Sequence, residues 1–155
     1  MTLPTTVTLA RTALYAGLLA GALDITAAIL TNLQVPARAV LQSVASGLLG
    51  AEAYRGGWPT AWLGLAAHFA IMQVIAVIFV AAAAAIPALR RLWIPVGVVF
   101  GVAVWLAMAF VVVPMSASPL TPPADLMTAL KPIIVHIVAV GLPLAWVARR
   151  MLGAG

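Results

Sequence analysis

The sequence predicts an all-α fold: an integral membrane bundle of four transmembrane helices, with a short amphipathic or re-entrant helix between the first and the second. Composition is the first reason, because 65% of the 155 residues are hydrophobic and only 7% are charged, whereas soluble domains carry about 25% charged residues. The second reason is that four apolar runs reach the length of about 20 residues needed to cross a bilayer. The chain is short enough that we expect residues 1–155 to form a single domain.

Each predicted helix is bounded by recognisable signals. The four predicted spans are residues 10–33, 59–86, 95–113 and 125–150. The first apolar run continues to Leu33, longer than the core of a signal peptide, so we expect a retained helix. Pro59 suits the first turn of the second span, and Pro87 follows its end. The fourth span ends at Arg149 and Arg150, and Pro143 within it should kink the helix.

The basic residues predict an orientation. With four spans the two termini share a side, and that side carries Arg11, Arg90, Arg91, Arg149 and Arg150. The other side carries Arg38, Arg55 and Lys131, offset by Glu52 and Asp125. An excess of basic residues marks the cytoplasmic side, so both termini are expected in the cytoplasm. Because these residues are scattered at the ends of apolar runs, the net charge of +5 predicts no nucleic-acid partner.

The first outer connection, residues 34–57, contains a helical pattern over residues 37–50. Its apolar residues recur on one face at Leu41, Val44, Ala45, Leu48 and Leu49. Arg38, Gln42 and Ser46 lie on another face. The segment could lie on the outer membrane surface, or re-enter the membrane to cap a cavity. In either case Gln42, Ser43 and Ser46 are candidates to line an outer vestibule.

Glycine pairs predict close helix packing. Gly17 and Gly21 share a narrow stripe of the first helix with Asp24, so Asp24 is expected to face protein. Gly97 and Gly101 form a similar stripe on the third helix. We expect the two stripes to pack on each other or to form a contact between subunits.

Three ionisable residues are expected near the middle of the membrane. Asp24 interrupts the apolar stretch AGALDITAAIL, and His68 and His136 lie at a similar depth in the second and fourth helices. At least two of them should converge, because an isolated polar group is costly in hydrocarbon. Chains of Asp and His carry protons in membrane proteins. The same residues could instead bind a divalent metal, hold a haem between two histidines, or fix helix register by a hydrogen bond.

Other chemistry is not indicated. The absence of cysteine excludes disulfides, thiolate metal sites and thiol catalysis. No Gly-x-Ser-x-Gly, HExxH, phosphate-loop or dinucleotide motif occurs, so we expect no enzyme activity. Lys131, at the outer end of the fourth helix, is expected to reach the membrane interface, or to meet Glu52 or Asp125.

Four segments, LQSVASGLLGAEAYRGG, TAWLGLAAHF, VVVPMSASP and HIVAVGLPLAWVARR, occur in this order. With them the chain resembles a family of small four-span bacterial inner-membrane proteins of unknown function. The resemblance covers about residues 13–150 and includes Asp24, His68 and His136. It implies a multi-pass fold in the bacterial cytoplasmic membrane and no particular activity.

The leading hypothesis is a small transport or permeation protein, proton-linked, in which Asp24 carries the proton and His68 and His136 relay it or orient a ligand. The alternatives are a haem- or metal-binding protein at the same cluster, and a structural or assembly subunit that transports nothing. No cofactor is expected under the leading hypothesis. The expected partners are membrane lipids and further copies of the chain, because four helices alone rarely enclose a wide pore.

Overall fold

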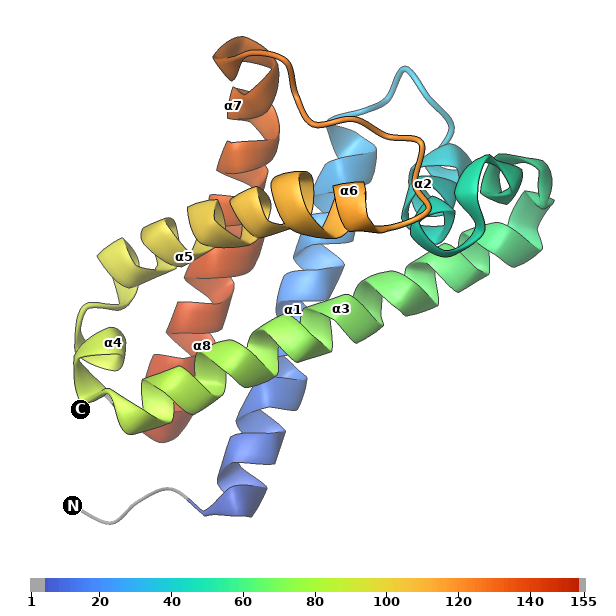
Figure 1. Ribbon diagram of the computed structural model, residues 1–155. Coiled ribbons are helices and arrows are strands. Elements are labelled where there is room, and N and C mark those ends of the chain that lie inside the picture. Colours follow the sequence, from blue (N-terminus) through green and yellow to red (C-terminus); the bar gives the residue numbers. More distant parts are fainter. Residues whose placement is uncertain (1–4, 154–155) are drawn as a thin grey trace.

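The computed structural model describes residues 5–153, which form helices joined by short connections and contain no strand (Figure 1). Four helices within this range are long and apolar enough to cross a membrane: Thr6–Leu30, Gly57–Ala85, Trp93–Met115 and Leu126–Leu152. The predicted all-α bundle of four spans is therefore confirmed. The first span begins and the fourth span ends at one end of the bundle, and the connections that follow the first and third spans lie at the other.

The first span, α1 (Thr6–Leu30), begins and ends earlier than predicted. At its start the Thr5 hydroxyl oxygen accepts the Thr8 N–H at 3.2 Å, a cap that the apolar pattern could not reveal. At its end the side chains of Thr31 and Asn32 donate to the carbonyls of Ala27 and Ala28. These local side-chain bonds compete with further helix, so the helix stops at Leu30 although the predicted span extends to Leu33.

The short helix α2 (Ala37–Leu49) packs closely on the second span, α3 (Gly57–Ala85). A 3₁₀ turn, η1 (Gly50–Arg55), joins them. Gly50, which begins this turn, and Gly57, which begins α3, have φ of 61° and 63°. These left-handed conformations favour glycine and allow the chain to reverse here. The Leu41 carbonyl lies against Gly64, where a β-carbon would collide with it.

The buried face of α2 combines residues of its apolar and polar stripes. It contains Leu41 and Ala45 from the apolar stripe, and Gln42 and Ser46 from the polar one. Leu48 and Leu49, which also belong to the apolar stripe, are exposed. Burial of the two polar side chains is stable because each forms hydrogen bonds to neighbouring segments.

The third span is longer than predicted because it passes through Pro114. It consists of α5 (Trp93–Ala107), a π-helical turn η2 (Met108–Val112) and α6 (Val113–Met115). Proline lacks an N–H and collides with the preceding turn, and the wider π turn accommodates it. Before this span, the short α4 (Pro87–Arg91) carries the buried Arg90, whose Nη1 donates to the Leu152 carbonyl at 2.8 Å.

The fourth span contains the expected proline distortion. It consists of α7 (Leu126–Val135), the π-helical segment η3 (His136–Gly141) and α8 (Leu142–Leu152). The distortion ends just before Pro143, which cannot donate to the turn behind it. Asp125 precedes α7 as its N-cap, one position before the helix.

The four spans are not evenly spaced around the bundle. In Figure 1, α1 and the α7–α8 helix rise side by side, and α3 crosses in front of them. α1 contacts both α3 and α8, whereas α5 contacts η3 and α8 and meets α3 at few positions. The fully buried core is built largely from alanines, which lets the crossing helices approach closely.

The two glycine stripes pack on different helices, so the expectation that they pack on each other is wrong. Gly17 and Gly21 lie against the Gln73 and Phe69 side chains of α3. On α5, Gly97 and Gly101 lie against the backbone of η3 around Gly141. The geometric reason is that the distorted fourth span, not α1, is the neighbour of α5.

Replacing Gly64 by Ala should lower the free energy of unfolding by about 1–3 kcal/mol, because the new methyl group meets backbone that cannot yield. Gly47→Ala is the matched control, since its β-carbon would lie 3.7 Å from Ser116 in ordinary contact and alanine favours helix. Unfolding in detergent by a denaturing surfactant measures both. Equal stability of the two variants would contradict the close α2–α3 packing.

Candidate functional site

A small pocket lies between the last turns of α1 and the fourth span. Its volume is about 110 Å³. It is lined by Asp24, Ala28, Thr31, Asn32, Lys131, Pro132, Val135 and His136. Of the three ionisable residues expected to converge, Asp24 and His136 therefore share a pocket, and Lys131 joins them.

The Asp24 carboxylate lies at this pocket, and one of its oxygens lacks a hydrogen-bond partner within residues 5–153. The residue is half-buried, and its Oδ1 is buried with no hydrogen-bond partner among the described residues. No ion pair links it to His136 or Lys131, because the only ion pair within residues 5–153 joins Arg55 to Glu52. An unsatisfied buried carboxylate oxygen is costly, and a proton or a hydrogen-bond donor in the pocket would remove that cost.

His136 is held in one tautomer by the backbone of its own helix. Its Nδ1 lies 2.8 Å from the Pro132 carbonyl oxygen. Because a carbonyl oxygen only accepts, Nδ1 carries the hydrogen and donates it. In the neutral ring Nε2 is therefore the nitrogen with a free lone pair. His136 is also the first residue of the π-helical segment, so the distortion and the ionisable side chain coincide.

Lys131 fastens the outer end of α1 to the fourth span. Its Nζ donates to the Thr31 carbonyl at 2.9 Å and to the Asn32 side-chain oxygen at 3.1 Å. A cation is favoured at the carboxyl end of a helix, where carbonyls are unsatisfied. The residue is exposed, as expected for a side chain that reaches an interface, but it binds neither Glu52 nor Asp125. Nothing in the sequence pattern pairs residue 131 with residues 31 and 32.

His68 does not line this pocket. It is buried in the crossing of α3 over α1, and its Nε2 lies 3.0 Å from the Gly21 carbonyl. Nε2 must therefore donate, and the ring also packs edge-on against Phe69. This arrangement fixes the two helices relative to each other. His68 thus packs between the two helices, next to Gly21, which lies about one turn of α1 from Asp24.

The candidate vestibule residues form structural hydrogen bonds. Gln42 donates to the Gly57 carbonyl and to Thr60, and only 2% of its surface is exposed. Ser43 donates to the Val40 carbonyl within its own helix. Ser46 is fully buried and bonds Ser118 at 3.0 Å. Gln42 and Ser46 thus join α2 to its neighbours, and a role for these three residues in a vestibule stays a prediction.

The donor set of the pocket does not suit a metal or haem. Within residues 5–153, no three side chains of His, Cys, Asp or Glu lie close enough to hold a metal ion together. Lys131 also adds a positive charge that opposes a cation. A volume of about 110 Å³ is far below the roughly 300–1,000 Å³ typical of cofactor pockets. The pocket has room for water molecules or a small ion.

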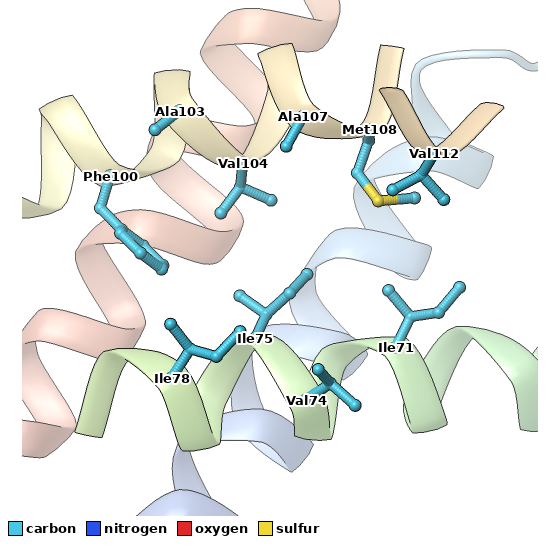
Figure 2. Close-up of a pocket in the computed structure, with 10 residues that line it drawn as sticks. All are labelled: Ile71, Val74, Ile75, Ile78, Phe100, Ala103, Val104, Ala107, Met108 and Val112. Atoms are coloured by element: carbon cyan, nitrogen blue, oxygen red, sulfur yellow. The ribbon is translucent and has the colours of Figure 1, made fainter. Parts of the chain in front are cut away.

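A second, apolar groove lies between α3 and α5. Its volume is about 440 Å³. Figure 2 shows side chains of α3 facing side chains of α5 and η2 across it. Its lining is Ile71, Val74, Ile75, Ile78, Phe100, Ala103, Val104, Ala107, Met108 and Val112. Nothing there could orient a ligand by a polar contact. The groove is lined by apolar side chains alone, whereas polar and ionisable side chains line the Asp24 pocket.

No protein-family model, curated protein or solved structure matches the chain. The resemblance to small four-span bacterial membrane proteins stays a prediction.

The stability of the cap at the start of α7 should depend on pH. This helix carries Lys131 and leads directly into His136. The backbone N–H of Thr128 donates to Asp125 at 2.9 Å and holds the pKa of that carboxyl below its usual value of 3.8. Because the folded pKa is lowered, the cap stabilises the helix above pH 3.8 and loses that contribution as the pH falls through the folded pKa. Hydrogen exchange of the Thr128 amide in micelles should accelerate, relative to neighbouring amides, only at these acid pH values.

Asp125→Asn is the matched control for this titration. Asparagine caps helices about as well as aspartate but has no carboxyl to titrate. Protection of the Thr128 amide should then be independent of pH in the acid range. The same acid dependence in both proteins would show that Asp125 is not the titrating group.

Proposed function

We propose that this multi-pass membrane protein carries out proton-linked transport, with Asp24 as the proton-binding group and His136 as its partner. The observation that carries the proposal is the buried, unpartnered Oδ1 of Asp24 in a pocket that it shares with His136 and Lys131. Intramembrane carboxylates and histidines commonly mark ion and proton pathways.

The exposure of the residues that line the pocket supports entry of protons from one side of the membrane. Thr31 and Lys131 at its rim are exposed, whereas Asp24 and His136 deeper in are half-buried. On the other side of Asp24, toward the termini, the packed core begins with Ala20 and Ala16, both fully buried. The geometry thus suits a state in which Asp24 exchanges protons only with the compartment facing the α1–α2 connection.

Release to the opposite side requires a conformational change, and η3 is the segment we assign to it. The π-helical hydrogen bonding of residues 136–141 is a local irregularity of a kind that recurs at functional sites. It begins at His136, so a shift of this segment would move the imidazole relative to Asp24. By the distribution of arginines, the pocket would face the periplasm and the termini the cytoplasm of a bacterial inner membrane, in a homo-oligomer.

Asp24→Asn tests the proposal. The amide cannot bind the transported proton, so proton flux in liposomes under an imposed pH gradient should fall to the level of protein-free liposomes. A pH-sensitive dye inside the vesicles measures the flux. The variant should fold, since the pocket accommodates an isosteric side chain.

Glu52→Gln is the control, because it removes an exposed carboxylate whose only partner is Arg55. Its flux should equal that of the unchanged protein. Undiminished flux in Asp24→Asn, or no flux above background in the unchanged protein, would refute proton transport and favour a structural subunit.

The two histidines should behave differently. His136→Gln should lower the proton flux about tenfold, equivalent to about 1.4 kcal/mol, because the pocket loses the imidazole that lines it. His68→Leu should leave flux per folded molecule unchanged and lower the free energy of unfolding by about 1 kcal/mol, the value of an interhelical hydrogen bond. Flux and surfactant unfolding measured on the same preparations separate the two effects. The reverse assignment would contradict the proposed role of His136.

A further inference from the structure

A second polar pocket lies at the end of the bundle that carries the termini. It has a volume of about 570 Å³, between the first residue of α5 and the last turns of α8. Trp93, Trp146, Arg149, Arg150 and Gly153 line it. None of these residues takes part in the proposed proton pathway.

The two guanidinium groups are positioned by the two indoles. The Cζ atom of Arg149 lies 5.9 Å from the centre of the Trp93 ring, and that of Arg150 lies 5.7 Å from the Trp146 ring. Such contacts use the face of the guanidinium and leave its N–H edge free. Paired N–H groups on that edge match two oxygens of a phosphate.

No acidic side chain of the protein competes for these arginines. The chain has three acidic residues. Asp24 lies in the pocket described above, Glu52 pairs with Arg55, and Asp125 caps α7.

The surroundings place this anion site at the edge of the apolar zone. Trp146 is 43% exposed, and indoles of this kind concentrate at the headgroup level of membranes. Exposed apolar side chains adjoin the pocket in sequence, namely Leu92, Ile94 and Met151. A ligand that carries both a phosphate and acyl chains can contact the arginines and the apolar side chains. A free phosphate can contact only the arginines.

We infer that Trp93, Trp146, Arg149 and Arg150 form a binding site for the phosphate headgroup of an anionic phospholipid. The guanidinium edges bind the phosphate oxygens, the indoles hold the guanidinium planes, and the acyl chains lie along the apolar surface of α5 and α8. This inference does not depend on proton transport. It assigns a function to the paired arginines beyond setting the orientation of the protein.

Native mass spectrometry of the delipidated protein in detergent tests the site. Phosphatidylglycerol and phosphatidylcholine with identical acyl chains are titrated separately. The unchanged protein should retain phosphatidylglycerol in preference to phosphatidylcholine. Arg149→Gln combined with Arg150→Gln should weaken phosphatidylglycerol binding about 30-fold, about 1 kcal/mol for each arginine.

Arg11→Gln combined with Arg91→Gln is the matched control. It removes two exposed arginines from the same end of the bundle that do not line the pocket. Binding within about twofold of the unchanged protein is expected, below 0.5 kcal/mol. Equal weakening in both double variants would show a diffuse basic surface and overturn the site.

Two measurements on the unchanged protein complete the test without relying on a variant. An absence of preference for phosphatidylglycerol over phosphatidylcholine would overturn the inference. Inorganic phosphate at millimolar concentration should not displace bound phosphatidylglycerol. Displacement by inorganic phosphate would identify a site for free phosphate and overturn the lipid assignment.

Discussion

The close approach of helix backbones at glycines is the constraint on which the rest of the structure depends. A β-carbon at Gly64 would collide with the Leu41 carbonyl, and one at Gly101 would lie 2.6 Å from the Cα of Ile137. Within a bilayer, apolar surface gains nothing by leaving lipid for protein, so helices associate through tight van der Waals packing. Glycine and alanine make that packing possible at the α2–α3 and α5–η3 contacts.

Tight packing at these two contacts also determines where polar chemistry is possible. Because α5 lies directly on η3, the fourth span is held at its distorted segment, with His136 facing α1. Because α3 crosses α1 at Gly21, His68 is used within that crossing. The gap between α3 and α5 is left to apolar side chains. Asp24 therefore has one polar neighbourhood, on the side of the fourth span.

Polar groups in this protein serve two distinct purposes. Most of them form hydrogen bonds with one another or with backbone carbonyls at the ends of helices. Gln42 donates to the Gly57 carbonyl, Lys131 to the Thr31 carbonyl after α1, and Arg90 to the Leu152 carbonyl at the end of α8. The Asp24 Oδ1 and the Arg149–Arg150 pair differ, because within residues 5–153 the first has no hydrogen-bond partner and the second forms no ion pair. Groups of this second kind are the natural places to expect a proton or an anionic ligand.

The sequence alone determined the four spans and singled out Asp24 and His136 as candidate site residues. Hydropathy predicts spans because a bilayer requires long apolar helices, whatever their neighbours, and prolines predicted the distortion near Pro143. The boundaries were less accurate, since caps such as Thr5 and Asp125 act through single hydrogen bonds. Periodicity did not predict which face of α2 packs on protein, because it counts Gln42 and Ser46 as polar without knowing their partners.

Only the tertiary structure decided which helices are neighbours. Side chains at equal depth on three helices look equivalent in a sequence, yet His68 binds the Gly21 backbone and His136 shares the pocket of Asp24. The bond from Lys131 to the end of α1 spans about a hundred positions of the chain. Such contacts depend on the order and crossing of the helices, and these follow from close packing among many small residues at once. No single motif encodes them.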